Sequence, residues 1–136
     1  MTLTYESSSA AREHFKDILD AAEDGRLVAV YREGRQSAVV SADRLRYFLA
    51  GVLPRAAVVP EDGGWSIFIP GSFVAADGAS FDVAVDEMVE ALREYAEDWQ
   101  DHLLRASDHQ DQWGLVQFVS LSDDGQLRDW LISEPA

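Results

Sequence analysis

The feature that most constrains this chain is a long run, residues 81–103, in which apolar side chains recur at alternating intervals of four and three. The stripe consists of Phe81, Val85, Met88, Leu92, Tyr95, Trp99 and Leu103. This spacing places all of them on one side of an α-helix. Ser80 can cap the helix and Asp82 lies in its first turn, where the helix dipole favours a carboxylate. The sequence therefore predicts a helix from about Phe81 to Leu104 that lies on a sheet.

The segments around this helix predict the sheet. Residues 53–71 contain two β-rich runs separated by a turn at Glu61 to Gly64, which indicates a hairpin. The apolar run WGLVQFVSL, residues 113–121, predicts a third strand, and the run QLRDWLI after Asp123-Asp124-Gly125 predicts a short helix. Residues 55–136 are thus predicted to fold as a compact β-β-α-β-α domain.

Residues 1–51 predict a smaller module of a different pattern. A short strand, TLTY, precedes a serine cluster that can cap a helix over AAREHFKDILDAAEDG. Two β-rich runs flank Glu33-Gly34 and predict a hairpin, and Ser41 can cap a second helix that Gly51 ends. The order is β-α-β-β-α, and the fold class of the whole chain is α+β, with two modules joined tightly near Gly51.

Two helices of this first module carry apolar faces that are expected to be buried. In the first helix the face consists of Ala11, Phe15, Ile18, Leu19 and Ala22, and in the second it consists of Leu45, Phe48 and Leu49.

Charge divides the chain at the same place. The formal net charge is −14, of which residues 1–50 hold −1 and residues 51–136 hold −13. A strongly acidic surface repels nucleic acid and attracts a basic protein. Alternatively, the acidic surface serves only to keep the protein in solution. Charge alone leaves both interpretations open.

Residue types argue against an enzyme and against a metal or cofactor. The chain has no cysteine, and the three histidines, His14, His102 and His109, lack metal-ligand spacing and are expected at the surface. A two-metal nuclease needs carboxylates on adjacent strands, but neither WSIFIP nor GLVQFVSL contains one. We therefore expect no catalytic residue, no metal site and no cofactor.

The sequence also predicts a cytoplasmic protein that does not contact a membrane. No stretch approaches the roughly 18 apolar residues of a membrane helix, and the N-terminus lacks the basic and then apolar pattern of a signal peptide.

The first fifty residues resemble the Phd/YefM (prevent-host-death) antitoxin family. The resemblance is carried by SAAR, by the helix end LDAAEDG, by the hairpin VAVYREGRQSAVV and by the short helix SADRLRYFL. It implies a homodimer, or a higher even oligomer, that binds operator DNA and represses its own operon while a downstream segment neutralises a toxin.

The same resemblance implies which residues contact DNA. They are Arg12, from SAAR, and Arg32, which ends the first hairpin strand. Guanidinium groups can contact phosphates or bind guanine edges bidentately. Lys16, Arg35 and Ser9 are further candidates, although each can equally be a solvated surface residue. The module is not net basic, so DNA binding would be salt-sensitive and modest.

The second half departs from that family, whose members usually end in a disordered tail. Residues 63–99, from GGWSIFIPG to EYAEDW, are similar instead to HicB-type antitoxin domains. This resemblance implies a degraded ribonuclease-H-like fold that sequesters a small toxin. The candidate partner-binding residues are Glu90, Glu94, Glu97, Asp98, Asp101 and Trp113, and Trp113 can alternatively be a core residue.

The leading interpretation is a type II antitoxin whose partners are a cognate basic toxin, expected to be a ribonuclease, and operator DNA. An alternative is a stand-alone transcriptional regulator whose C-terminal domain senses a ligand or supports oligomerisation. A third is a protein that binds its toxin but has lost affinity for DNA.

Overall fold

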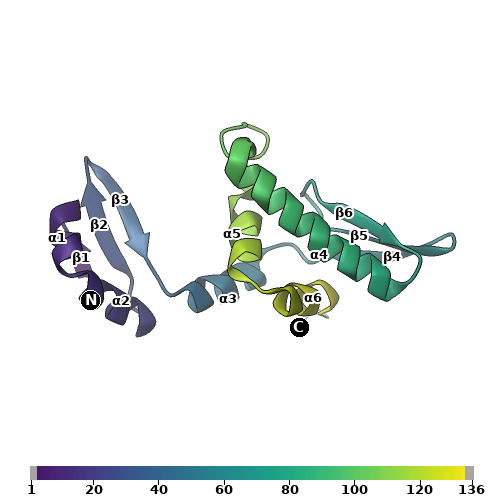
Figure 1. The fold of residues 1–136 in the computed structure, drawn as a ribbon, viewed down its shortest axis with the longest axis horizontal. Helices are drawn as coiled ribbons and strands as arrows, with labels where there is room; N and C mark the ends of the chain where they lie inside the picture. Colours follow the sequence, from purple (N-terminus) through teal and green to yellow (C-terminus); the bar gives the residue numbers. More distant parts are fainter. Residues whose placement is uncertain (1–2, 134–136) are drawn as a thin grey trace. The chain divides into compact units, whose positions relative to one another are not determined.

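The computed structural model describes residues 3–133, which divide into two compact units between Tyr47 and Phe48. The boundary falls within helix α3 (Ala42–Val52), four residues before Gly51. Figure 1 labels the helices and strands of the two units.

The first unit is a three-stranded sheet with two short helices. Strand β1 (Leu3–Tyr5) is followed by α1 (Ser8–Glu13) and α2 (Phe15–Glu23), and then by β2 (Val28–Arg32) and β3 (Arg35–Val39). The strand order is β1-β2-β3, with β1 parallel and β3 antiparallel to β2. The parallel pairing requires a crossover, which α1 and α2 supply.

The predicted first helix is interrupted at His14. This residue has the non-helical angles φ −118° and ψ 26°, and it ends α1 and caps α2. The prediction of one continuous helix was therefore wrong. The serine cluster does cap α1: Ser7 is the cap, and its Oγ accepts a hydrogen bond of 3.1 Å from the amide of Ala10.

The core of the first unit is small. Ile18, Ala21 and Val28 are buried, and Leu3, Tyr5, Ala11, Val30 and Val39 pack against them. Phe15 and Leu19, which the sequence placed on the buried face, are 60% and 42% exposed. Phe15 and Leu19 remain uncovered because no other element of this unit is large enough to cover them. In the second predicted helix, whose residues from Phe48 on belong to the second unit, Leu49 is buried but Phe48 is exposed.

Gly51 does not end α3. The helix continues to Val52, and Gly51 is not among the described residues with positive φ. The cause of termination is Pro54, which lacks an amide hydrogen and disfavours helical angles in the residue before it.

The second unit contains a meander of three antiparallel strands in the order β4-β5-β6. These are β4 (Ala57–Glu61), β5 (Gly64–Phe68) and β6 (Ala75–Gly78). The hairpin of β4 and β5 was predicted, but β6 was not, because VAADG has few β-branched residues and contains a typical turn pair, Asp77-Gly78.

Helix α4 (Phe81–Asp98) begins at its predicted cap, Ser80, and continues as a π-helical turn, η1 (Trp99–Leu103). It lies along the sheet in Figure 1. The predicted stripe is largely buried, since Val85, Met88 and Leu92 are fully buried and Trp99 is 7% exposed. Trp65 of β5 meets Phe81 edge to face at 5.6 Å.

The predicted third strand, WGLVQFVSL, is a helix. After a 3-10 turn, η2 (Gln110–Gln112), the chain forms α5 (Trp113–Leu121) and α6 (Asp124–Ile132), both packed against α4 (Figure 1). The buried residues of α5 are Leu115, Val116, Phe118 and Val119. This spacing is that of a helix face, but a short and largely apolar run is equally compatible with a buried strand, and this misled the prediction. The observed order is therefore β-β-β-α-α-α rather than β-β-α-β-α.

Helix α4 passes very close to β6 at Gly78. A Cβ added there would lie 2.3 Å from the amide nitrogen of Ala84, whereas a Cβ at Gly51 would meet nothing within 4 Å. We expect Gly78→Ala to destabilise the second unit by about 1–3 kcal/mol through overpacking. As a matched control, Gly51→Ala should stabilise the chain by up to about 1 kcal/mol, since alanine favours a helix interior.

Urea unfolding monitored by circular dichroism measures both changes. Equal effects of the two substitutions would contradict the close packing of α4 on β6.

Candidate functional site

The predicted DNA-contacting arginines are exposed. Arg12 lies in the last turn of α1, and Arg32 and Arg35 flank the turn between β2 and β3. Among residues 3–133 the side chain of none of the three forms a hydrogen bond or an ion pair. Their guanidinium groups are thus available to an external ligand.

Arg32 and Arg35 form the last cross-strand pair of the hairpin. The turn residues Glu33 and Gly34 both have positive φ, 51° and 77°, as a two-residue primed turn requires. Residues directly opposite in an antiparallel pair share a face, and like charges in that position are destabilising. The hairpin therefore holds two like charges side by side at a cost that an anionic partner would offset.

Lys16 and Ser9 differ from these arginines. The Nζ of Lys16 donates to Asp20 at 2.7 Å, and this hydrogen bond raises the pKa of Lys16. Because the charge of Lys16 is already paired with that of Asp20, we expect Lys16 to contribute less to DNA binding than the three arginines. Ser9 is exposed in the first turn of α1, but the cap is Ser7.

The predicted acidic surface runs along α4 and η1. Glu90, Glu94, Glu97 and Asp101 share one side of the helix by their spacing, and Asp98 lies beside them; all five are exposed. In the described part of the chain the four on α4 have no basic partner, and Asp101 approaches only His102, at 3.6 Å. Like charges one turn apart repel, so this surface also gains from a cation.

Trp113 begins α5 and is 51% exposed. It is therefore neither a strand residue nor a core residue. A half-exposed tryptophan is compatible with the interface role suggested for it.

His109 is not the surface histidine that the sequence suggested, because its side chain is only 16% exposed. Its Nδ1 lies 2.7 Å from the hydroxyl of Tyr95, and its ring lies 4.1 Å from that of Phe73. The indole Nε1 of Trp99 donates to the carbonyl of His109 at 2.8 Å. Burial, and then the charges of Asp111 and Asp108, raise the pKa of Tyr95. His14 and His102 are exposed, as expected.

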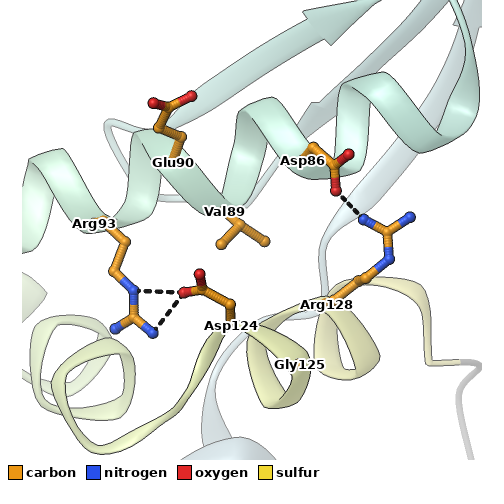
Figure 2. Close-up of a pocket in the computed structure, with 7 residues that line it drawn as sticks. All are labelled: Asp86, Val89, Glu90, Arg93, Asp124, Gly125 and Arg128. Atoms are coloured by element: carbon orange, nitrogen blue, oxygen red, sulfur yellow. Dashed lines mark hydrogen bonds and ion pairs between the residues drawn. The ribbon is translucent and has the colours of Figure 1, made fainter.

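Sequence reasoning overlooked a pocket between α4 and α6, of about 420 Å³. Figure 2 shows its lining residues: Asp86, Val89, Glu90, Arg93, Asp124, Gly125 and Arg128. Arg128 pairs with Asp86 and with Asp82, the latter at 3.0 Å. Arg93 and Arg128 are two of the few basic residues in the strongly acidic second half of the sequence. Their rarity there is the one sequence feature that could have indicated that both pair with acidic residues.

Arg93 connects three helices. Its guanidinium donates to the carbonyls of Val119 and Ser122, both at 2.7 Å, and to Oδ1 of Asp124 at 2.9 and 3.0 Å. The two carbonyls lie at the C-terminal end of α5, which is the negative end of its helix dipole. Asp124 lies in the first turn of α6, where the dipole favours a carboxylate.

In residues 3–133 no three His, Cys, Asp or Glu side chains are grouped so that they could hold a metal ion. No helix in that range is both long and apolar enough to cross a membrane.

No protein-family model matches the chain, and no curated protein sequence matches it. One solved structure with a similar fold is described as the antitoxin part of a proposed toxin/antitoxin system from Syntrophomonas wolfei subsp. wolfei. The TM-score is 0.78 at 20% sequence identity, and the likeness covers 98% of each chain. The chain thus shares the fold of that structure over nearly its full length.

We expect Arg93→Ala to destabilise the second unit by about 1–3 kcal/mol, because the substitution leaves two carbonyls without their charged donor. Arg93→Lys should recover only part of this loss, since one ammonium cannot reproduce the planar guanidinium fork. Thermal unfolding of the two variants and of the parent chain measures the effect. If both variants melted with the parent chain, the three-helix connection would contribute nothing to stability.

Proposed function

We propose that this chain is a type II antitoxin that neutralises a cognate basic toxin and, as a dimer on operator DNA, represses its own operon. The observation that carries the proposal is the likeness of the fold, over nearly its full length, to that of a protein described as an antitoxin. The division of charge along the sequence supports separate DNA-binding and toxin-binding parts.

Dimerisation is proposed for the first unit. Its core contains few residues, while Phe15, Leu19, Leu27 and Tyr47 expose between 42% and 82% of their surface. Exposed apolar side chains favour association when they gather in one patch. A second copy would also double the number of free arginines and match a two-fold operator.

The DNA-binding surface is proposed to consist of Arg12, Arg32 and Arg35, with Ser9 as a phosphate donor and Lys16 in a minor role. The three arginines are exposed and free of other partners among the described residues. Phosphate contacts by such groups make the affinity strongly dependent on salt.

Toxin binding is proposed for the acidic side of α4, through Glu90, Glu94, Glu97, Asp98 and Asp101, with Trp113 as an apolar anchor. The unmatched charge of this surface selects a basic protein. A ribonuclease toxin, which must itself bind RNA, has the required positive surface.

For DNA binding, the fragment upstream of the coding region should bind the chain, and Arg12→Ala should weaken the affinity about tenfold or more. Lys16→Ala should change it little, because Lys16 is paired with Asp20. Fluorescence anisotropy at two salt concentrations measures both the affinity and the number of phosphate contacts.

Wild-type protein that binds this fragment no better than random DNA would exclude operator repression. Toxin binding would then be the remaining role.

For toxin binding, the chain should co-purify with the product of the neighbouring reading frame. The double variant Glu94→Gln/Glu97→Gln should weaken that complex about tenfold, and Trp113→Ala should weaken it by about 2 kcal/mol if Trp113 anchors the interface. Glu61→Gln, an equal kind of charge change on β4, is the control.

Isothermal titration with the purified partner measures the affinities. A chain that regulates its operator but binds no neighbouring product would instead be a stand-alone regulator.

A further inference from the structure

We propose that the pocket between α4 and α6 is the receptor for one arginine or lysine side chain of the toxin. The toxin as the source of that side chain rests on the proposed function. That the pocket binds a cation follows from its lining residues, which lie on α4 and α6 (Figure 2).

The pocket's own cations are already engaged. Arg93 directs its donors to two carbonyls and to Asp124, and Arg128 donates to Asp82 and Asp86. Neither guanidinium is therefore free to bind an anion, and the lining would repel a phosphate or a carboxylate.

The pocket has one negative charge in excess. Three lining residues are acidic, Asp86, Glu90 and Asp124, and two are basic. The Glu90 side chain forms no hydrogen bond or ion pair within residues 3–133 and stands at the rim, its carboxylate turned away from α6 in Figure 2. The side chains of Asp86 and Asp124 are 71% and 77% exposed although each accepts from an arginine. The site therefore has acceptors and charge for a single added cation.

The floor of the pocket suits an aliphatic stem. Val89, almost wholly buried, lies between the two arginine clusters, and Gly125 leaves the facing wall without a side chain. Arginine and lysine lay their methylene groups on apolar surface and keep the charged end at its edge. A side chain laid across Val89 would bring its charged end to the rim of the pocket at Glu90, whose exposed side chain has no partner among the described residues and can turn to meet it. A volume of about 420 Å³ is near the small end of ligand pockets, so it suits one long side chain rather than a helix.

Gly125 also provides a way to close the pocket without disturbing the fold. It is the second residue of α6, and it is not among the described residues with positive φ. A Cβ built there first meets Oδ1 of Asp123, at 3.4 Å, so a side chain is tolerated locally. In Gly125→Leu the added side chain would occupy the pocket.

The first experiment titrates the 15N-labelled full chain with N-acetyl-arginine amide and, as an uncharged control of the same shape, N-acetyl-citrulline amide. We expect backbone amide shifts at Val89, Glu90 and Gly125 with the arginine probe alone. Glu90→Gln should weaken this binding several-fold, Gly125→Leu should abolish it, and Glu87→Gln, on the same helix but outside the pocket, should leave it unchanged.

Shifts that are absent, scattered over the acidic surface, or equal for the two probes would overturn the proposal. Thermal melts show whether each variant is folded. If Gly125→Leu does not fold, the comparison of Glu90→Gln with its control Glu87→Gln still tests the proposal.

The second experiment measures the toxin affinity of the same variants. Glu90→Gln and Gly125→Leu should each weaken the complex about tenfold or more, as expected for a lost charged contact. If the toxin binds wild type and both variants equally, the pocket is not its receptor, while the antitoxin function stands. If the neighbouring product does not bind wild type at all, the proposed function fails, and the arginine titration alone decides whether the pocket binds a cation.

Discussion

The second unit depends on burying helix α4 from two directions. Its stripe of Val85, Met88 and Leu92 is fully buried, as are Ile67 of the sheet and Val116 and Leu127 of the following helices. The helix can lie this close to the sheet because Gly78 has no side chain where the backbone of α4 passes. Once these sides of α4 are covered, its remaining surface can be polar without loss of stability. The acidic surface of the protein is thus a consequence of how the core is built.

The charges of this unit fall into two groups with different roles. Asp82, Asp86 and Asp124 are matched by Arg93 and Arg128, which tie α4 to α5 and α6. Glu90, Glu94, Glu97 and Asp98 have no such match among the described residues. Exposed ion pairs contribute little to stability, but Arg93 also satisfies two carbonyls and so has a structural role. The unmatched group is what remains for a partner.

The first unit differs in that Arg12, Arg32 and Arg35 are exposed without a side-chain partner among the described residues, although the unit as a whole is not net basic. Arg32 and Arg35 are held side by side by a tight turn, and Arg12 lies exposed in the last turn of α1. The unit also leaves Phe15 and Leu19 in contact with solvent, because its few strands and short helices cannot cover them. Both features, unpaired arginines and uncovered apolar side chains, are unfavourable for an isolated chain. They are the properties expected of a surface that associates with another copy and with an anion.

The sequence by itself determined the features that are local or periodic: the caps Ser80 and Ser41, the Glu33-Gly34 turn, the long amphipathic helix and the change of charge near Gly51. Only the tertiary structure decided that WGLVQFVSL is a helix, that Ala75–Gly78 is a strand, and that Arg93 and Arg128 meet acids far away in the sequence. The physical reason is that β-branched residues fit a buried helix as well as a strand, so packing against α4 overrides their preference. The short segment AADG pairs as a strand because β5 supplies its partner. Contacts such as these, between residues distant in the chain, leave no local pattern.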